Sequence, residues 1–187
     1  AAATRLRVGY RNIILDPSAQ TVHFRNSEME IDPGGIGKGY TVDRMAAVLR
    51  QRGIESSLIA ASSSTMYGMG TPPGEPRGWR VTIRHPERPK DSIAEVFLKS
   101  MSLSTSGSSE KSFIANGRVY SHLMDPRTGE PAEGILVAVM APRNIDTEAW
   151  TKACFVNGRA WAAIHPMDSA RVFFCGGNHK DACKWLY

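Results

Sequence analysis

The sequence predicts an α+β fold. Short apolar segments typical of strands outnumber the segments with helical periodicity, and the two kinds do not alternate regularly along the chain. This order favours an α+β architecture over a doubly wound parallel sheet. The 187 residues, 42% hydrophobic and 22% charged, are enough to bury one sizeable core. We therefore expect residues 1–187 to form a single domain in which helices pack on a mixed or antiparallel sheet.

The first expected elements are a hairpin and a helix. Residues 11–15 and 21–25 flank the turn signal at 16–20, which begins with Asp-Pro. Residues 40–52 are expected to form an amphipathic helix, and Gly53 is a typical residue just past a helix C-terminus. The apolar residues of this segment recur at i, i+3, i+4 and i+7: Val42, Met45, Ala46 and Leu49.

The later elements are mostly strands. They are expected at residues 57–61, 80–85, 93–98, 113–115, 119–123, 136–140 and 171–175. Asn116-Gly117 is the strongest short hairpin signal in the chain. A second helix is expected to begin behind Asp146 as its N-cap and to stop at Gly158. Residues 71–78 are rich in proline and glycine, and we expect a surface loop there that is too short to divide domains.

Charge and cysteine content narrow the functional class. The net charge of +5 favours anionic partners, but the basic residues are scattered, so nucleic-acid binding is not expected. No apolar run approaches membrane-spanning length, and the N-terminus lacks the apolar region of a signal peptide; we expect a soluble chain, or a mature or trimmed product. The three cysteines have neither CxxC nor His-Cys zinc spacing, which leaves a Cys175–Cys183 pair and the redox compartment open.

A glycine-rich segment at residues 31–44 indicates a phosphate site. Four glycines and Lys38 lie directly before the helical pattern. Glycine has no Cβ, so backbone N–H groups at a helix start can approach a phosphate closely. The alternative is a tight connection between a strand and a helix.

A second segment, residues 121–131, contains the best candidate for a general base. His122 adjoins a polar, turn-forming loop, and imidazole titrates in a range where it can activate a hydroxyl. The alternative is a strand histidine with one structural hydrogen bond. The following Asp-Pro-Arg-Thr-Gly can equally be a turn in which Asp125 accepts hydrogen bonds from its own backbone.

Together these segments resemble the ApbE family of FAD:protein FMN transferases, whose hallmarks read GGIAKGYAVD and HHIIDPRTGxPA. Two more motifs occur in family order: Leu103 to Gly107 is similar to the ATSG strand end, and Phe155 to Gly158 to FVLG. The resemblance covers residues 29–164. It implies an α+β fold related to T-fold proteins, and a Mg²⁺-dependent enzyme that moves FMN from FAD to a threonine hydroxyl of an acceptor flavoprotein. It also implies a place outside the cytoplasm, with membrane contact only through a lipid anchor that this chain does not contain.

The resemblance implies the following site residues. His122 would be the catalytic base. The nucleotide would contact Gly35, Lys38, Tyr40, Thr105, Ser106, Asp125, Arg127 and Thr128. The Mg²⁺ ion would be bound by the backbone carbonyl of Gly37 and by Glu148. For Tyr40, packing at the helix start is the alternative, and for Thr105 and Ser106 it is a strand end.

The chain departs from the family at the metal site. The family has an aspartate and, four residues later, a threonine; these positions are Glu148 and Lys152 here. A glutamate and a lysine at this spacing form the usual surface ion pair of a helix, and a charged lysine cannot bind Mg²⁺. Either an ammonium stands where the cation would be, or Asp146 and Thr151 are recruited by a local shift.

Other departures concern the length and the upstream sequence. The family's GGD loop is replaced by residues 61–65, which keep hydroxyl groups but no acidic group. The family's upstream part is absent, so we expect a fragment, a divergent short member or a processed form. Three functions stay open: FMN transfer, FAD binding without catalysis, and hydrolysis of the FAD pyrophosphate. The other histidines have no clustered partners in the sequence and are expected to be surface or packing residues: His23, His85, His165 and His179.

Overall fold

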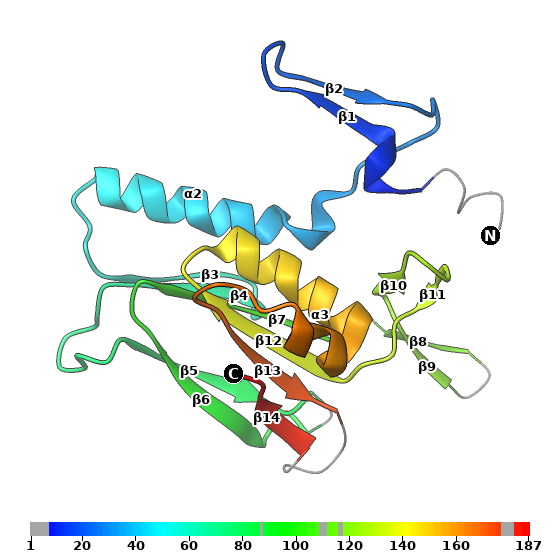
Figure 1. The fold of residues 1–187 in the computed structure, drawn as a ribbon. Coiled ribbons are helices and arrows are strands. Elements are labelled where there is room, and N and C mark those ends of the chain that lie inside the picture. Colours follow the sequence, from blue (N-terminus) through cyan, green and yellow to red (C-terminus); the bar gives the residue numbers. More distant parts are fainter. Residues whose placement is uncertain (1–7, 87, 109–111, 116–117, 177–181) are drawn as a thin grey trace.

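A computed structural model describes residues 8–86, 88–108, 112–115, 118–176 and 182–187 (Figure 1). Its centre is a six-stranded sheet in the order β14-β13-β12-β7-β4-β3, and each neighbouring pair of strands is antiparallel. The strands are β3 (Ser57–Ala61), β4 (Thr65–Met69), β7 (Met101–Gly107), β12 (Leu136–Ala141), β13 (Arg171–Cys175) and β14 (Cys183–Trp185). The predicted α+β class with a packed antiparallel sheet is confirmed.

Each face of this sheet is covered by a different element. Helices α2 (Gly37–Gln51) and α3 (Asn144–Ile164) lie on one face, and the hairpin of β5 (Trp79–Arg84) and β6 (Ser92–Leu98) lies on the other (Figure 1). Alternate residues of β12 therefore point into two cores. Val137 and Val139 pack with Phe155 of α3, whereas Leu136, Ala138 and Met140 pack with the apolar side chains of β5 and β6. This arrangement explains why every residue of β12 is buried.

Besides the β5–β6 hairpin, three smaller hairpins lie outside the central sheet in the described part of the chain. The pair β1 (Ile13–Asp16) and β2 (Thr21–Phe24) confirms the predicted N-terminal hairpin. The pair β8 (Ser112–Ala115) and β9 (Arg118–Ser121) flanks Asn116-Gly117, which lies outside the described residues. The third pair is β10 (Met124–Asp125) and β11 (Glu130–Pro131). Two short 3-10 turns, η1 (Tyr10–Asn12) and η2 (Pro33–Gly35), precede α2.

The start of α3 differs from the prediction. The helix begins at Asn144, and Asp146 lies in its first turn instead of capping it. The cap comes from the other helix: the Asp43 carboxylate accepts hydrogen bonds from the backbone N–H groups of Asn144 and Ile145 at 2.9 and 3.0 Å. A carboxylate at a helix N-terminus satisfies N–H groups that have no partner within the helix.

Other boundaries also differ. Helix α2 begins three residues before the predicted residue 40. The predicted stop at Gly158 is a kink, since this glycine has a left-handed φ of 80° and helical structure resumes beyond it. Neither helix in the described part of the chain is long and apolar enough to cross a membrane.

Candidate functional site

A polar cavity of about 360 Å³ lies where the start of α2 meets the end of β7 and the segment after β9. It brings together five of the predicted site residues: Gly35, Lys38, Thr105, Ser106 and His122. It is also lined by Asp32, Gly34, Ser64, Gly107, Leu123 and Lys152. Residues from five separate parts of the sequence therefore line one cavity.

The glycine-rich segment is shaped by local and by long-range contacts. Asp32 caps η2, where its carboxylate accepts a hydrogen bond from the Gly34 N–H at 2.7 Å. At Gly39 the two helices approach closely, since a Cβ there would lie 2.5 Å from the carbonyl oxygen of Asn144. Glycine at this position is therefore needed for helix packing, and that packing places Lys38 over α3.

The central feature of the site is a buried carboxylate, Glu148, on α3. Its side chain is fully buried, and its Oε1 lies 3.2 Å from the Lys38 Nζ and 3.3 Å from the Lys152 Nζ. Its Oε2 accepts a hydrogen bond from the Gly39 backbone N–H. Both oxygens are thus occupied by donors of this chain. A buried carboxylate requires such partners, because an unpaired buried charge is very costly.

The two lysines bring positive charge to the cavity wall, to which Asp32 contributes a carboxylate. Lys38 is 40% exposed and Lys152 22% exposed, so both ammonium groups can also meet a ligand. Burial is the largest effect on Lys152 and lowers the pKa of its ammonium, and Lys38 lowers it further; Glu148 acts in the opposite direction. Lys38 and Lys152 share the Glu148 carboxylate, and each ammonium group can also pair with a bound anion.

The residues implied for Mg²⁺ do not fit that ion. The Gly37 carbonyl lies in the first turn of α2 and accepts a hydrogen bond from the Thr41 hydroxyl at 2.8 Å. Glu148 is bound to two ammonium groups, which would repel a divalent cation.

The alternative metal ligands are no better placed. Asp146 forms an ion pair with Arg143 at 3.4 Å, and the Thr151 hydroxyl donates to the Glu148 carbonyl at 2.8 Å. Neither residue lines the cavity. The local shift considered from the sequence is therefore not what the structure shows.

Hydroxyl groups form another wall of the cavity. Ser64 comes from the turn between β3 and β4, and its carbonyl accepts the Thr105 backbone N–H at 2.8 Å. This bond holds the turn against β7, where Thr105 and Ser106 line the cavity. Ser64 was not among the predicted site residues. The hydroxyl-rich sequence of residues 61–65 was the available signal.

Four predicted nucleotide contacts do not line the cavity: Tyr40, Asp125, Arg127 and Thr128. Asp125 binds Arg127 two residues away, at 2.7 Å, and this guanidinium is the largest cause of a lowered Asp125 pKa. The Thr128 hydroxyl accepts the Glu130 N–H at 3.1 Å. These contacts match the turn that was the alternative interpretation of Asp-Pro-Arg-Thr-Gly. Tyr40 is 56% exposed on α2.

An adjoining cavity of about 480 Å³ is more apolar in its lining. It shares Ser64, Thr105 and Gly107 with the first cavity. Its apolar residues come from the central sheet and the β5–β6 hairpin: Met66, Val81, Ile83, Leu103 and Leu136. A ligand with a charged centre and an aromatic ring system could therefore use both hollows.

Comparisons with known proteins identify the family to which this chain belongs. The sequence model described as ApbE family matches residues 1–173. The chain is 28% identical over 173 residues to the FAD:protein FMN transferase of Klebsiella pneumoniae (strain 342), covering 90% of this chain and 52% of that protein. It is 33% identical over 138 residues to the FAD:protein FMN transferase of Escherichia coli (strain K12), covering 70% and 38%. The chain thus spans about half the length, or less, of the curated relatives it matches.

Solved structures share the fold. The ApbE protein of Thermotoga maritima superposes with a TM-score of 0.84 at 28% identity, covering 93% of this chain and 57% of that one. The apo form of the flavinyl transferase ApbE of Pseudomonas stutzeri gives a TM-score of 0.78 at 25% identity, covering 98% and 56%.

Proposed function

Because this chain belongs to the ApbE family, we propose that it binds FAD and transfers FMN to a threonine hydroxyl of an acceptor flavoprotein. The observation that carries the proposal is the shared cavity, in which Lys38, Lys152 and His122 surround one polar hollow. The two curated relatives described above are named FAD:protein FMN transferase. The acceptor and its threonine are proposed from the family resemblance.

In this proposal the FAD pyrophosphate lies beside the two lysines. Attack at phosphorus requires that the negative charge of the pyrophosphate be neutralised. The ammonium groups of Lys38 and Lys152 would provide the positive charge that does so. We propose that the hydroxyls of Ser64, Thr105 and Ser106, which line the cavity, donate hydrogen bonds to phosphate oxygens. One ring system of FAD would occupy the adjoining apolar cavity.

His122 is proposed as the general base. It would accept the proton of the acceptor threonine while the threonine oxygen forms a bond to the FMN phosphorus. The bond from that phosphorus to the bridging oxygen breaks, and AMP leaves. The products are the FMN phosphoester and AMP, and the proton rests on His122 until solvent removes it.

Mg²⁺, which the resemblance implies, has no part in this scheme, because the donors at Glu148 are lysine and backbone N–H groups. The same observation favours a second candidate function, FAD binding without transfer. We also propose, from the resemblance alone, that the protein works outside the cytoplasm and that a lipid anchor provides any membrane contact.

The test combines binding and turnover. Saturating FAD should raise the melting temperature, because a ligand that binds only the folded state stabilises it. Incubation with FAD and a threonine-bearing acceptor should release AMP and label the acceptor with flavin in equal amounts. A raised melting temperature without AMP release would indicate a domain that binds FAD without transferring FMN. AMP release without a labelled acceptor would indicate hydrolysis of the FAD pyrophosphate. An unchanged melting curve would refute the FAD site.

A further inference from the structure

A second cluster of reactive side chains lies at the end of the β5–β6 hairpin. His85 and the two cysteines Cys175 and Cys183 have their ligand atoms within 4.8 Å of one another. His85 is 1% exposed and Cys175 is 3% exposed. The sequence separates His85 from the cysteines by about 90 residues, so no sequence motif shows that they meet in the fold. The burial of His85 agrees with the expectation of a packing residue.

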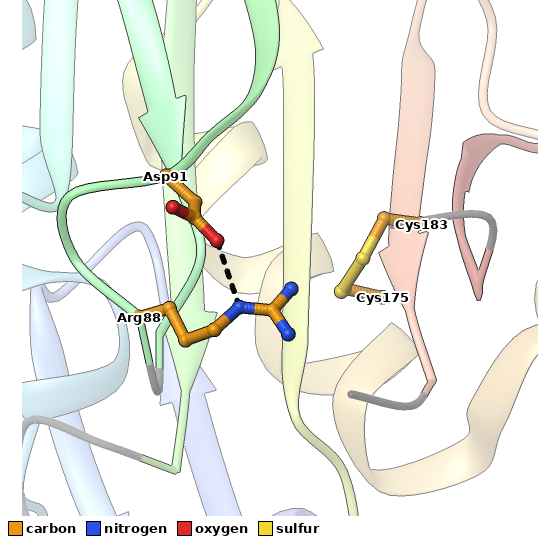
Figure 2. Close-up of a disulfide and its surroundings, with 4 residues drawn as sticks. All are labelled: Arg88, Asp91, Cys175 and Cys183. Atoms are coloured by element: carbon orange, nitrogen blue, oxygen red, sulfur yellow. Dashed lines mark ion pairs between the residues drawn. A yellow bond between two sulfur atoms is a disulfide. The ribbon is translucent and has the colours of Figure 1, made fainter. Parts of the chain in front are cut away.

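The fold brings the three residues together from β13, from β14 and from the turn that follows β5. Cys175 and Cys183 are register partners in β13 and β14, where the structure joins them as a disulfide (Figure 2). His85 follows β5, and its backbone N–H donates to the Asp91 carbonyl at 2.9 Å to close the hairpin turn. Asp91 also pairs with Arg88 at 2.8 Å in this turn (Figure 2). The imidazole is thus held at the edge of the central sheet.

We propose that His85, Cys175 and Cys183 bind Zn²⁺, or a similar thiophilic divalent cation, when the two cysteines are reduced. Two thiolates and one imidazole are a known zinc donor set, and a water molecule can fill the fourth position. Magnesium would not be selected, because it prefers oxygen ligands. His85 also lines the cavity of about 480 Å³, which gives a cation a route to the site.

Disulfide and metal are then alternative states of the same two sulfur atoms. A thiol or phosphine reductant supplies two electrons, and with two protons the S–S bond becomes two thiols. Metal binding releases those two protons, since the ligands are thiolates. Oxidation by a disulfide-class oxidant reverses the sequence and frees the cation. This inference does not depend on the proposed FAD chemistry.

A bound cation would connect parts of the fold that share no strand pairing. The β5–β6 hairpin forms its own two-stranded sheet, and it contacts the central sheet through side chains. A metal held by His85 and the two cysteines would fix the hairpin to the β13–β14 edge. We therefore expect Zn²⁺ to raise the melting temperature of the reduced protein and to leave that of the oxidised protein unchanged.

In the experiment, the full chain is titrated with Co²⁺ and with Zn²⁺. Each titration is carried out once on the reduced protein and once on the oxidised protein. The reduced parent should bind one cation with thiolate-to-cobalt charge-transfer absorption, and the oxidised parent should bind none there. A Cys175→Ser, Cys183→Ser double variant should lose this absorption, and His85→Asn should weaken binding by about tenfold or more, the scale seen for disturbing metal sites. Cys154→Ser is the matched control. Cys154 lies in the core on the other face of the central sheet, next to α3, and burial raises the pKa of its thiol to about 11.

A measurement on the parent protects the test against a variant that fails to fold. X-ray absorption of the zinc-loaded parent should show two sulfur ligands at about 2.3 Å and nitrogen at about 2.0 Å. No binding by the reduced parent, a zinc shell without sulfur or without nitrogen, or equal affinity in the double cysteine variant would overturn the proposal.

Discussion

The start of α2 is held by contacts with residues distant in the sequence, whereas the turn between β10 and β11 is held by a contact between near neighbours. Lys38 and Gly39 bind Glu148, and Asp43 caps Asn144, so the first region depends on residues about 100 positions away. Asp125 binds Arg127 two positions away, at the surface. A change in the first region should therefore disturb the helix pair and the cavity together. A change in the second should stay local.

The largest effect is expected at Glu148. A Glu148→Gln change leaves two ammonium groups beside a neutral amide, so it should lower the free energy of unfolding by about 3 kcal/mol. This value is at the lower end of the losses found for broken buried ion pairs, because Lys38 is partly exposed. Urea denaturation measures this loss. Asp125→Asn is the matched control in the other region and should have a much smaller effect. Equal losses in the two variants would remove the contrast.

A large effect on chemistry, but not on folding, is expected at His122. His122→Asn should lower FMN transfer by roughly 10² or more, the usual scale for a lost general base, with FAD affinity nearly retained. Rates under saturating FAD measure this, and His23→Asn, an exposed strand histidine, is the control. Unchanged transfer would remove His122 from the mechanism. A large drop in melting temperature would indicate a structural role.

An intermediate effect is expected at the cap of α3. Asp43→Ala should cost about 1–2 kcal/mol of stability, as for other lost N-caps, because two backbone N–H groups lose their acceptor. Asp146→Ala should cost a few tenths of that, since its ion pair with Arg143 is exposed. Thermal unfolding of the two variants compares the caps directly. The reverse order would restore Asp146 as the N-cap.

The smallest effect is expected from the Asp125–Arg127 pair. Arg127 lowers the pKa of Asp125, so this pair contributes above the pKa of an unfolded aspartate, and its contribution is lost as pH falls through the lowered folded value. An NMR titration of the carboxyl carbon should show a midpoint below about 3.9, and Arg127→Ala should return it toward that value. A normal midpoint in the parent protein would show that the pair does not form in solution.

Local sequence patterns predicted much of the fold. The N-terminal hairpin, α2, β3 and β12 follow from periodicity and turn residues, and Gly53 follows α2 with a left-handed φ of 74°. The serine-rich β7 was named only through a family motif. Its buried Ser102 and Ser104 are not apolar, and they bond instead to the Ala141 carbonyl and the Thr147 hydroxyl.

The parts that could not be predicted depend on contacts between distant residues. Glu148 and Lys152 have the spacing of a surface ion pair, but the close approach at Gly39 buries the carboxylate under α2. The cap from Asp43 has the same origin, since only helix packing brings it to Asn144. The cluster at His85 needs two separate sheets to meet. The spacing of residues along the sequence does not predict such tertiary contacts.

The central claim is that the lysines at Glu148 bind the FAD pyrophosphate without a divalent cation, and calorimetric titration with FAD in EDTA and in Mg²⁺ tests it most directly. The parent should bind FAD equally well in both. Lys152→Thr should bind more weakly in EDTA, and the Glu148→Asp, Lys152→Thr double variant should gain affinity for Mg²⁺, because an ammonium no longer repels the cation. FAD binding by the parent that requires Mg²⁺, or a double variant with no gain in Mg²⁺ affinity, would contradict the account.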